Sequence, residues 1–235
     1  PGEQDALIKK ILATNKNTVL VINTGSPVSM PWIKSCPAIL QTWFPGQEFG
    51  NALAEILFGK ESPSGKLPTT YPKKLSDTPA YSSYPGKNLQ MDYKEKLLVG
   101  YKWYDKKKIE PLFPFGHGLS YSKFKLKKVS VTKKKNEIKI KVKLKNIGDI
   151  STFETVQCYL ERKAVKAEIP KKKLVDFKKL KITKNKSKKL TLKVSKRDLS
   201  EWDVKKSKWE IAKGDYIIHV GTSVKDISIT EEIKI

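Results

Sequence analysis

Hydrophobic and polar residues alternate strictly along one stretch in the second half of the chain. Residues 138–144 (IKIKVKL) place single lysines between apolar side chains, the period of two expected for a strand with one buried face. Three further apolar runs follow, each bounded by turn residues: 156–160 (VQCYL), 190–194 (LTLKV) and 216–220 (YIIHV). Several short strands at this spacing are typical of an antiparallel sandwich, so we predict an all-β unit at 122–235.

The first sixty residues follow a different pattern. Apolar residues at helical spacing predict two helices, at 5–12 and 47–58. Between them, the continuous apolar runs 18–22 and 38–40 have the pattern of parallel strands that are buried on both faces. A short helix fits into residues 30–35, between these two runs. This order of helices and strands indicates an α/β unit.

Residues 62–121 are rich in proline, glycine and aromatic side chains. A linker of that composition is often flexible, but this many aromatic side chains favours packing against a surface. We therefore predict a docked connector. The expected domains are an α/β unit at 1–73, the connector at 74–121 and the all-β unit at 122–235.

The chain is strongly basic, and its charge is uneven. Its 48 basic residues outnumber 24 acidic ones, and only Arg162 and Arg197 are arginine. Residues 1–121 carry a net charge of +5, and residues 122–235 carry +19. Such an excess of positive charge makes nucleic acid, anionic polysaccharide and membrane surfaces candidate partners. However, proteins recognise phosphates and bases mainly through the two-pronged guanidinium group of arginine, which is nearly missing here. We therefore predict no specific nucleic acid partner and favour the interpretation that the lysines only solvate an exposed face.

A dedicated polyanion site stays the alternative, and it would centre on lysine runs such as 171–173 or 133–135. Binding by solvated lysines would instead be weak, diffuse and removed by salt.

Compartment and cofactors are less constrained. No run reaches the roughly 18 apolar residues that a membrane span needs. Because the chain begins at Pro1 rather than Met, we expect the protein to start upstream, and the compartment stays open. Cys36 and Cys158 lie in different predicted units, so we predict buried free thiols. His117, in a predicted turn, and His219, on a predicted strand, form no zinc pattern with them, so no metal and no cofactor are expected.

Two ordered motifs carry a family resemblance. Residues 43–73 read WFPGQEFGNALAEILFGKESPSGKLPTTYPK, and residues 111–121 read PLFPFGHGLSY. With PGEQDALI, KNIGD, LSEWD and VGTS in order around them, they resemble the carboxyl-terminal half of glycoside hydrolase family 3, the β-glucosidase and β-xylosidase family. The resemblance implies an α/β fold, the end of a six-stranded α/β sandwich domain at 1–73, followed by an all-β fibronectin type III-like, immunoglobulin-like sandwich.

The resemblance also implies a mechanism. Retaining glycoside hydrolysis needs two carboxyl groups about 5–5.5 Å apart, one as nucleophile and one as acid/base. In the family, the nucleophilic aspartate lies in an amino-terminal barrel, and the acid/base glutamate commonly lies shortly upstream of the segment that matches Pro1-Gly2. Neither position falls within 1–235, so we predict no catalytic residue here and no activity of this chain alone. The expected partner is a β-linked glycoside, held through that barrel; a homo-oligomer stays open.

Carboxylates within the chain have structural interpretations. Glu3, Asp5 and Glu48 fall in the first turns of predicted helices, where acidic groups suit the helix dipole. Glu95 is the most interesting, because it belongs to the connector segment 92–105 (DYKEKLLVGYKWYD) that resembles the family's and could pass near the barrel. We favour a structural role for Glu95 over a catalytic one.

The same segment supplies the candidate substrate-binding residues Tyr93, Glu95, Tyr101 and Lys102. It departs from the family where Lys96 replaces a glycine and Lys102 replaces an arginine, whose guanidinium fork lysine cannot reproduce. The predicted function is the carboxyl-terminal portion of a β-glucosidase. The alternative is a noncatalytic module, or a decayed fragment, that binds polyanionic or glycan surfaces weakly.

Overall fold

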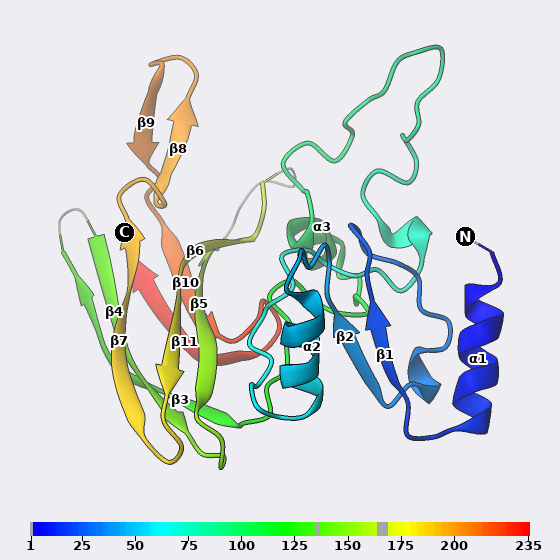
Figure 1. Ribbon diagram of the computed structural model, residues 1–235. Coiled ribbons are helices and arrows are strands. Elements are labelled where there is room, and N and C mark those ends of the chain that lie inside the picture. Colours follow the sequence, from blue (N-terminus) through cyan, green and yellow to red (C-terminus); the bar gives the residue numbers. More distant parts are fainter. Residues whose placement is uncertain (1, 135–136, 164–168) are drawn as a thin grey trace.

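The computed structural model describes residues 2–134, 137–163 and 169–235, which form an α/β unit beside a β-sandwich (Figure 1). The α/β unit consists of these elements: α1 (Gln4–Thr14), β1 (Val19–Ile22), the 3-10 helix η1 (Ile33–Ser35), β2 (Ala38–Gln41) and α2 (Phe49–Leu57). The predicted order of helices and strands is confirmed.

A small core holds the α/β unit together. Strands β1 and β2 pair in parallel, with Val19 opposite Ala38. The indole nitrogen of Trp32 donates a hydrogen bond of 2.8 Å to Asp5 in the first turn of α1, which ties that helix to the chain beyond β1. The buried apolar side chains of this core are Leu12, Ile22, Met30, Trp32 and Tyr71.

Two sequence-based expectations for this unit were wrong. Strand β1 was expected to be buried on both faces, but Val19 is 46% exposed, because the described sheet has two strands and is covered incompletely. Cys36 was expected to be buried in a strand-like setting, and it lies partly exposed in the turn after η1. Cys158 is buried, and burial raises the pKa of its thiol to about 12. Both cysteines are free, as predicted.

The connector contains two helices that the composition did not predict, η2 (Leu75–Asp77) and α3 (Tyr101–Lys107). Its last part is docked: Phe113 and His117 accept backbone hydrogen bonds from Tyr71 and Leu67. Residues 81–99 instead project from the body of the molecule (Figure 1). Packing of the connector thus differs along its length, and the docked connector as a whole stays a prediction.

The β-sandwich consists of two antiparallel sheets and a hairpin. One sheet has the order β11-β10-β5-β6: Ile227–Lys234, Asp215–Gly221, Thr152–Arg162 and Lys172–Ile182. The other has the order β3-β4-β7: Phe124–Lys133, Glu137–Asn146 and Ser187–Ser195. The hairpin pairs β8 (Ser200–Asp203) with β9 (Lys208–Ile211) and projects from the sandwich (Figure 1).

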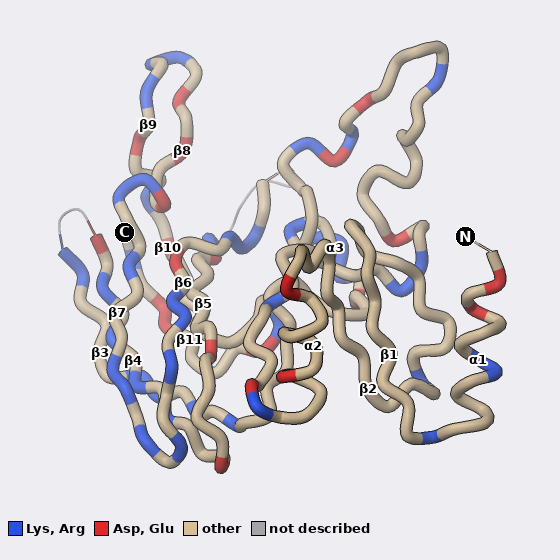
Figure 2. Tube along the Cα trace, viewed as in Figure 1, with Lys and Arg blue, Asp and Glu red and all other residues tan. Residues whose placement is uncertain are grey.

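The alternating sequence of β4 explains how the two sheets face each other. Ile138, Ile140, Val142 and Leu144 are at most 1% exposed and point into the core, while the lysines between them face outward. Lysine and arginine accordingly gather along β3, β4, β6 and β7 (Figure 2). Lys135, in one of the lysine runs noted above, lies outside the described residues.

Buried polar contacts join the α/β unit to the sandwich. The ammonium of Lys66 lies 2.8 Å from a carboxylate oxygen of Glu154 on β5, and it donates a bond of 2.7 Å to the carbonyl of Gly118. The amide of Gln157 donates to the carbonyl of Gly116, where an added Cβ would lie 2.2 Å from Gln157 Oε1. The FPFGHG turn is therefore held against β5. No helix in the described ranges is long and apolar enough to span a bilayer.

Limited proteolysis should leave a resistant carboxyl-terminal piece that contains Phe124–Ile235. The sandwich core has seventeen buried apolar side chains among the described residues, against five in the α/β core, and local opening is easiest where few apolar contacts are buried. Trypsin should cut first in the projecting loop, at Lys87, Lys94 or Lys96, as mass spectrometry of a time course would show. Equal persistence of residues 2–73 would contradict this prediction.

Candidate functional site

The four connector candidates occupy different environments. Tyr93 lies in the projecting loop and is 71% exposed, whereas Glu95 is only 8% exposed. Tyr101 and Lys102 begin α3 and are half-buried. Within the described part of the chain, no hydrogen bond, ion pair or ring contact joins any two of the four.

Glu95 has an unusual environment for a carboxylate. Its backbone carbonyl accepts a bond of 2.8 Å from Leu98 and closes a turn, and its Oε2 atom is buried with no hydrogen-bond partner among the described residues. The next residue, Lys96, has a φ of +51°, a conformation that glycine adopts with little strain. This explains why the family resemblance implies a glycine at position 96. The turn is strained in this chain as a result.

Tyr101 anchors α3 to the sandwich. Its hydroxyl accepts a hydrogen bond of 2.8 Å from the backbone nitrogen of Leu174 on β6. Its ring lies 4.8 Å from that of Phe115 and 6.0 Å from that of Tyr159 on β5, measured between ring centroids. Burial raises the pKa of Tyr101. These contacts are all with the protein itself, so they describe an anchor more directly than a substrate contact.

Lys102 lines a small hollow between α3 and the sandwich, together with Lys173 at the start of β6. Sequence reasoning missed Lys173 as an individual candidate, because it is one of three consecutive lysines. Lys171 pairs with Glu161 at 2.9 Å, and Lys172 lies 3.3 Å from Asp105 of α3. The three neighbours thus have different surroundings, which the run itself could not reveal.

The helix-end carboxylates have structural partners or positions. Glu3 precedes α1, and Asp5 accepts the hydrogen bond from Trp32. Glu48 precedes α2 and accepts a bond of 2.6 Å from the side-chain amide of Asn51. The first-turn prediction is therefore confirmed for Asp5 alone, because Glu3 and Glu48 lie one residue before their helices, at the N-cap.

The histidines are likewise held by the fold. His117 stacks on Phe113 with 5.2 Å between ring centroids, and burial, with the nearby Lys66 ammonium, lowers its pKa. His219 lies 2.8 Å from Glu161, and burial lowers its pKa although Glu161 acts in the opposite direction. Within 2–134, 137–163 and 169–235, no group of three or more histidine, cysteine or acidic side chains could hold a metal ion.

Comparison with known families assigns both units. The family model described as the glycosyl hydrolase family 3 C-terminal domain matches residues 1–121, and the fibronectin type III-like domain matches residues 154–224. The chain belongs to glycoside hydrolase family 3. This confirms the resemblance that the motifs at 43–73 and 111–121 carry.

Curated relatives match the chain along its whole length. Thermostable beta-glucosidase B of Acetivibrio thermocellus is 40% identical over 239 residues, a match that covers 100% of this chain and 32% of the relative. A β-glucosidase of Bacteroides ovatus is 40% identical, with 97% of this chain and 32% of the relative covered. The chain therefore spans about a third of the length of these family 3 relatives and corresponds to their carboxyl-terminal part.

Solved structures agree with the sequence matches. A β-glucosidase from Kluyveromyces marxianus superimposes with a TM-score of 0.96 at 35% identity, covering 100% of this chain and 28% of that one. A β-glucosidase from Streptomyces venezuelae, solved with D-glucose, gives a TM-score of 0.95 at 37% identity, with 100% of this chain and 31% of that one covered. The fold of the family 3 carboxyl-terminal region is thus present along the described residues.

Proposed function

We propose that this chain is the carboxyl-terminal part of a β-glucosidase and contributes to hydrolysis of terminal β-D-glucosides only together with an amino-terminal, barrel-bearing part. The observation that carries the proposal is the extent of the matches: all of this chain aligns with about a third of enzymes named β-glucosidase. We also propose domain limits at 1–73, 74–121 and 122–235.

The chemistry supports a contributing role over a catalytic one. A retaining glycosidase needs a nucleophilic carboxylate and an acid/base carboxyl group on either side of the scissile bond. The family resemblance places both of these outside residues 1–235. The carboxylates that do lie at helix ends here are engaged with the fold, as Asp5 is with Trp32 and Glu48 is with Asn51.

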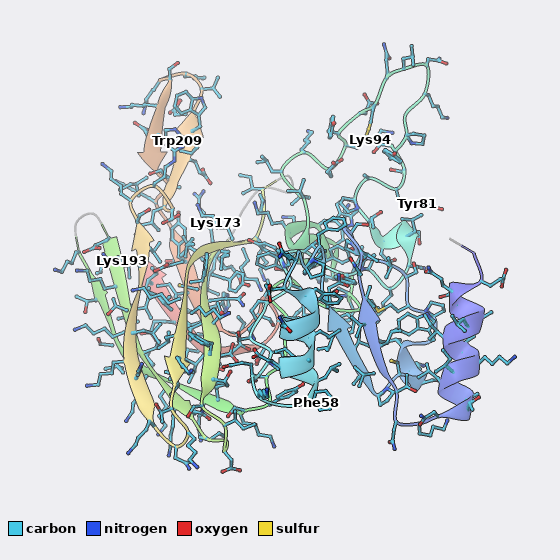
Figure 3. The ribbon with its side chains drawn as sticks, in the orientation of Figure 1. Phe58, Tyr81, Lys94, Lys173, Lys193 and Trp209 are labelled. Carbon is cyan, nitrogen blue, oxygen red and sulfur yellow. The ribbon has the colours of Figure 1, made fainter. Side chains whose placement is uncertain are left out.

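The surface of the α/β unit and the projecting loop supports the need for a second part. Several large apolar side chains are exposed there, and exposed apolar surface is a common mark of an interface. Figure 3 shows Phe58 at the end of α2 and Tyr81 and Lys94 on the connector. The most exposed are Phe44 (82%), Phe58 (84%), Tyr84 (71%), Leu89 (107%), Tyr93 (71%) and Leu97 (62%).

We propose that the barrel-bearing part covers these side chains and the open edges of the β1–β2 sheet.

A chimera tests the proposal. Residues 1–235 would replace the matching carboxyl-terminal third of the Acetivibrio thermocellus relative, and hydrolysis of an aryl β-glucoside would be measured. We expect activity from the chimera, and none above a buffer blank from 1–235 alone or from the relative's amino-terminal part alone. Circular dichroism would establish that each protein is folded.

A folded, soluble chimera without activity would contradict the proposal and favour the noncatalytic alternative. Turnover by 1–235 alone that Glu95→Gln abolishes would also contradict it, because it would give Glu95 a catalytic role.

A further inference from the structure

A small hollow lies where α3 meets the sandwich. Its volume is about 180 Å³, several times the roughly 30 Å³ that one water molecule occupies in the liquid. The hollow has room for a small ion and its waters but not for a polymer chain. Its charged lining residues are Lys102, Arg162, Lys171, Lys173, Asp198 and Glu201.

Most of these charges are already compensated. Two ion pairs account for two of the basic groups: Arg162 with Glu201 at 2.6 Å, and Lys171 with Glu161 at 2.9 Å. Asp198 is engaged as well, since its Oδ2 atom accepts hydrogen bonds from both the backbone nitrogen and the hydroxyl of Ser195. These donors are neutral, so Asp198 keeps its negative charge. Among the described residues that line the hollow, Lys102, Lys173 and Asp198 have no ion pair, which leaves one positive charge in excess.

Lys102 and Lys173 approach each other from different units. Both are half-buried, and within the described ranges neither ammonium has a hydrogen bond or an ion pair. Burial lowers the pKa of Lys173, and the like charge of Lys102 adds to this effect, while Asp198 and Glu201 act against it. With Asp198 as the carboxylate beside them, the two cations still carry one positive charge in excess among the described residues.

The backbones that carry these lysines are fixed to each other. Tyr101, next to Lys102, accepts the hydrogen bond of 2.8 Å from Leu174, which follows Lys173. Asp105, one turn further along α3, lies 3.3 Å from the ammonium of Lys172. Contacts between α3 and β6 therefore fix the backbone that carries Lys102 and Lys173. A ligand that binds there would not have to order this backbone.

We propose that Lys102 and Lys173 bind a small oxyanion between them, either free phosphate or a phosphate monoester. Such an anion would accept a charge-assisted hydrogen bond from each ammonium and relieve their repulsion. Because Lys102 belongs to the connector and Lys173 to the sandwich, the bound anion stabilises the junction between them.

Thermal unfolding of the 1–235 chain tests the site. Inorganic phosphate is titrated against chloride at constant ionic strength, with glucose 6-phosphate and uncharged glucose as parallel arms. We expect a saturable rise in Tm, of about 5–10 °C at a hundredfold excess over Kd. Lys173→Gln and Lys102→Gln should each weaken the affinity roughly tenfold or more, because each removes one charge-assisted hydrogen bond. Tighter binding of glucose 6-phosphate than of phosphate assigns the site to a monoester, and equal or weaker binding assigns it to the free ion.

Lys193→Gln is the matched control, because it removes one exposed lysine from β7, away from Lys173 (Figure 3). It should leave the phosphate effect unchanged. The proposal is overturned if phosphate gives no saturable rise in Tm. It is equally overturned if both lysine variants and the control respond like the original chain, which would mean general salt stabilisation.

Discussion

Glu154→Ala should lower the free energy of unfolding by about 3–5 kcal/mol, because it leaves the Lys66 ammonium buried without its anion. The two groups lie 2.8 Å apart, and their side chains are 13% and 8% exposed. Glu154 also accepts a hydrogen bond of 2.7 Å from the backbone nitrogen of Thr155, which would lose that partner. Such a loss is a large share of the roughly 5–15 kcal/mol that stabilises a typical domain.

Urea unfolding, followed by tryptophan fluorescence and circular dichroism, measures this change. Glu232→Ala is the matched control, since Glu232 pairs with Lys163 at 2.7 Å but its side chain is 70% exposed; it should cost at most about 1 kcal/mol. The apolar double variant Lys66→Met, Glu154→Leu should recover most of the lost stability, because neither charge is then buried alone. Equal effects of the Glu154 and Glu232 variants would refute the argument.

Local pattern was enough to predict most regular elements of the fold. The alternation at 138–144 predicted β4, because burial on one face of a sheet requires a period of two. Strands β5, β7 and β10 were predicted from short apolar runs bounded by turn residues. Helix α3 was missed because only seven residues, placed between Gly100 and a left-handed Lys108, form it within a proline- and glycine-rich segment.

Contacts between distant segments could not be predicted. Lys66 and Glu154 meet only because the FPFGHG turn brings the α/β unit onto β5. Nothing in their local sequence distinguishes Lys66 from the many exposed lysines. The partial exposure of β1 was missed for a similar reason. The apolar run at 18–22 indicates that the strand can be buried on both faces, but it does not indicate which segments cover those faces.

The candidate site shows the same division. The family motif identified the connector segment, but side-chain environment separates its members: Tyr93 is exposed, Glu95 is buried with an unpartnered oxygen, and Tyr101 holds α3 against β6. The substrate-binding assignment of these residues stays a prediction. Lys102 and Lys173 become neighbours only through the fold, so no spacing in the sequence could have paired them.

Asn146 joins three segments at the base of the sandwich, and its replacement should also be costly. The side chain is fully buried at the end of β4. Its Oδ1 atom accepts bonds from the Ser122 hydroxyl (2.6 Å) and the Gly148 nitrogen (3.0 Å), and its Nδ2 atom donates to the carbonyls of Ile150 (2.7 Å) and Ile182 (3.1 Å). The KNIGD motif therefore links three segments by buried hydrogen bonds: the start of β3, the β4–β5 turn and the end of β6.

Asn146→Ala should lower the free energy of unfolding by about 3–5 kcal/mol, because several buried donors and acceptors lose their partner at once and each costs about 1–3 kcal/mol. Ser122→Ala removes a single bond of the same network and should cost about 1 kcal/mol. Asn51→Ala is the surface control, because its side chain donates one exposed bond to Glu48; it should stay within about 0.5 kcal/mol. The graded order in urea unfolding distinguishes a network from a lone contact, and an Asn146 variant no less stable than the Ser122 variant would show that the network contributes nothing beyond one bond.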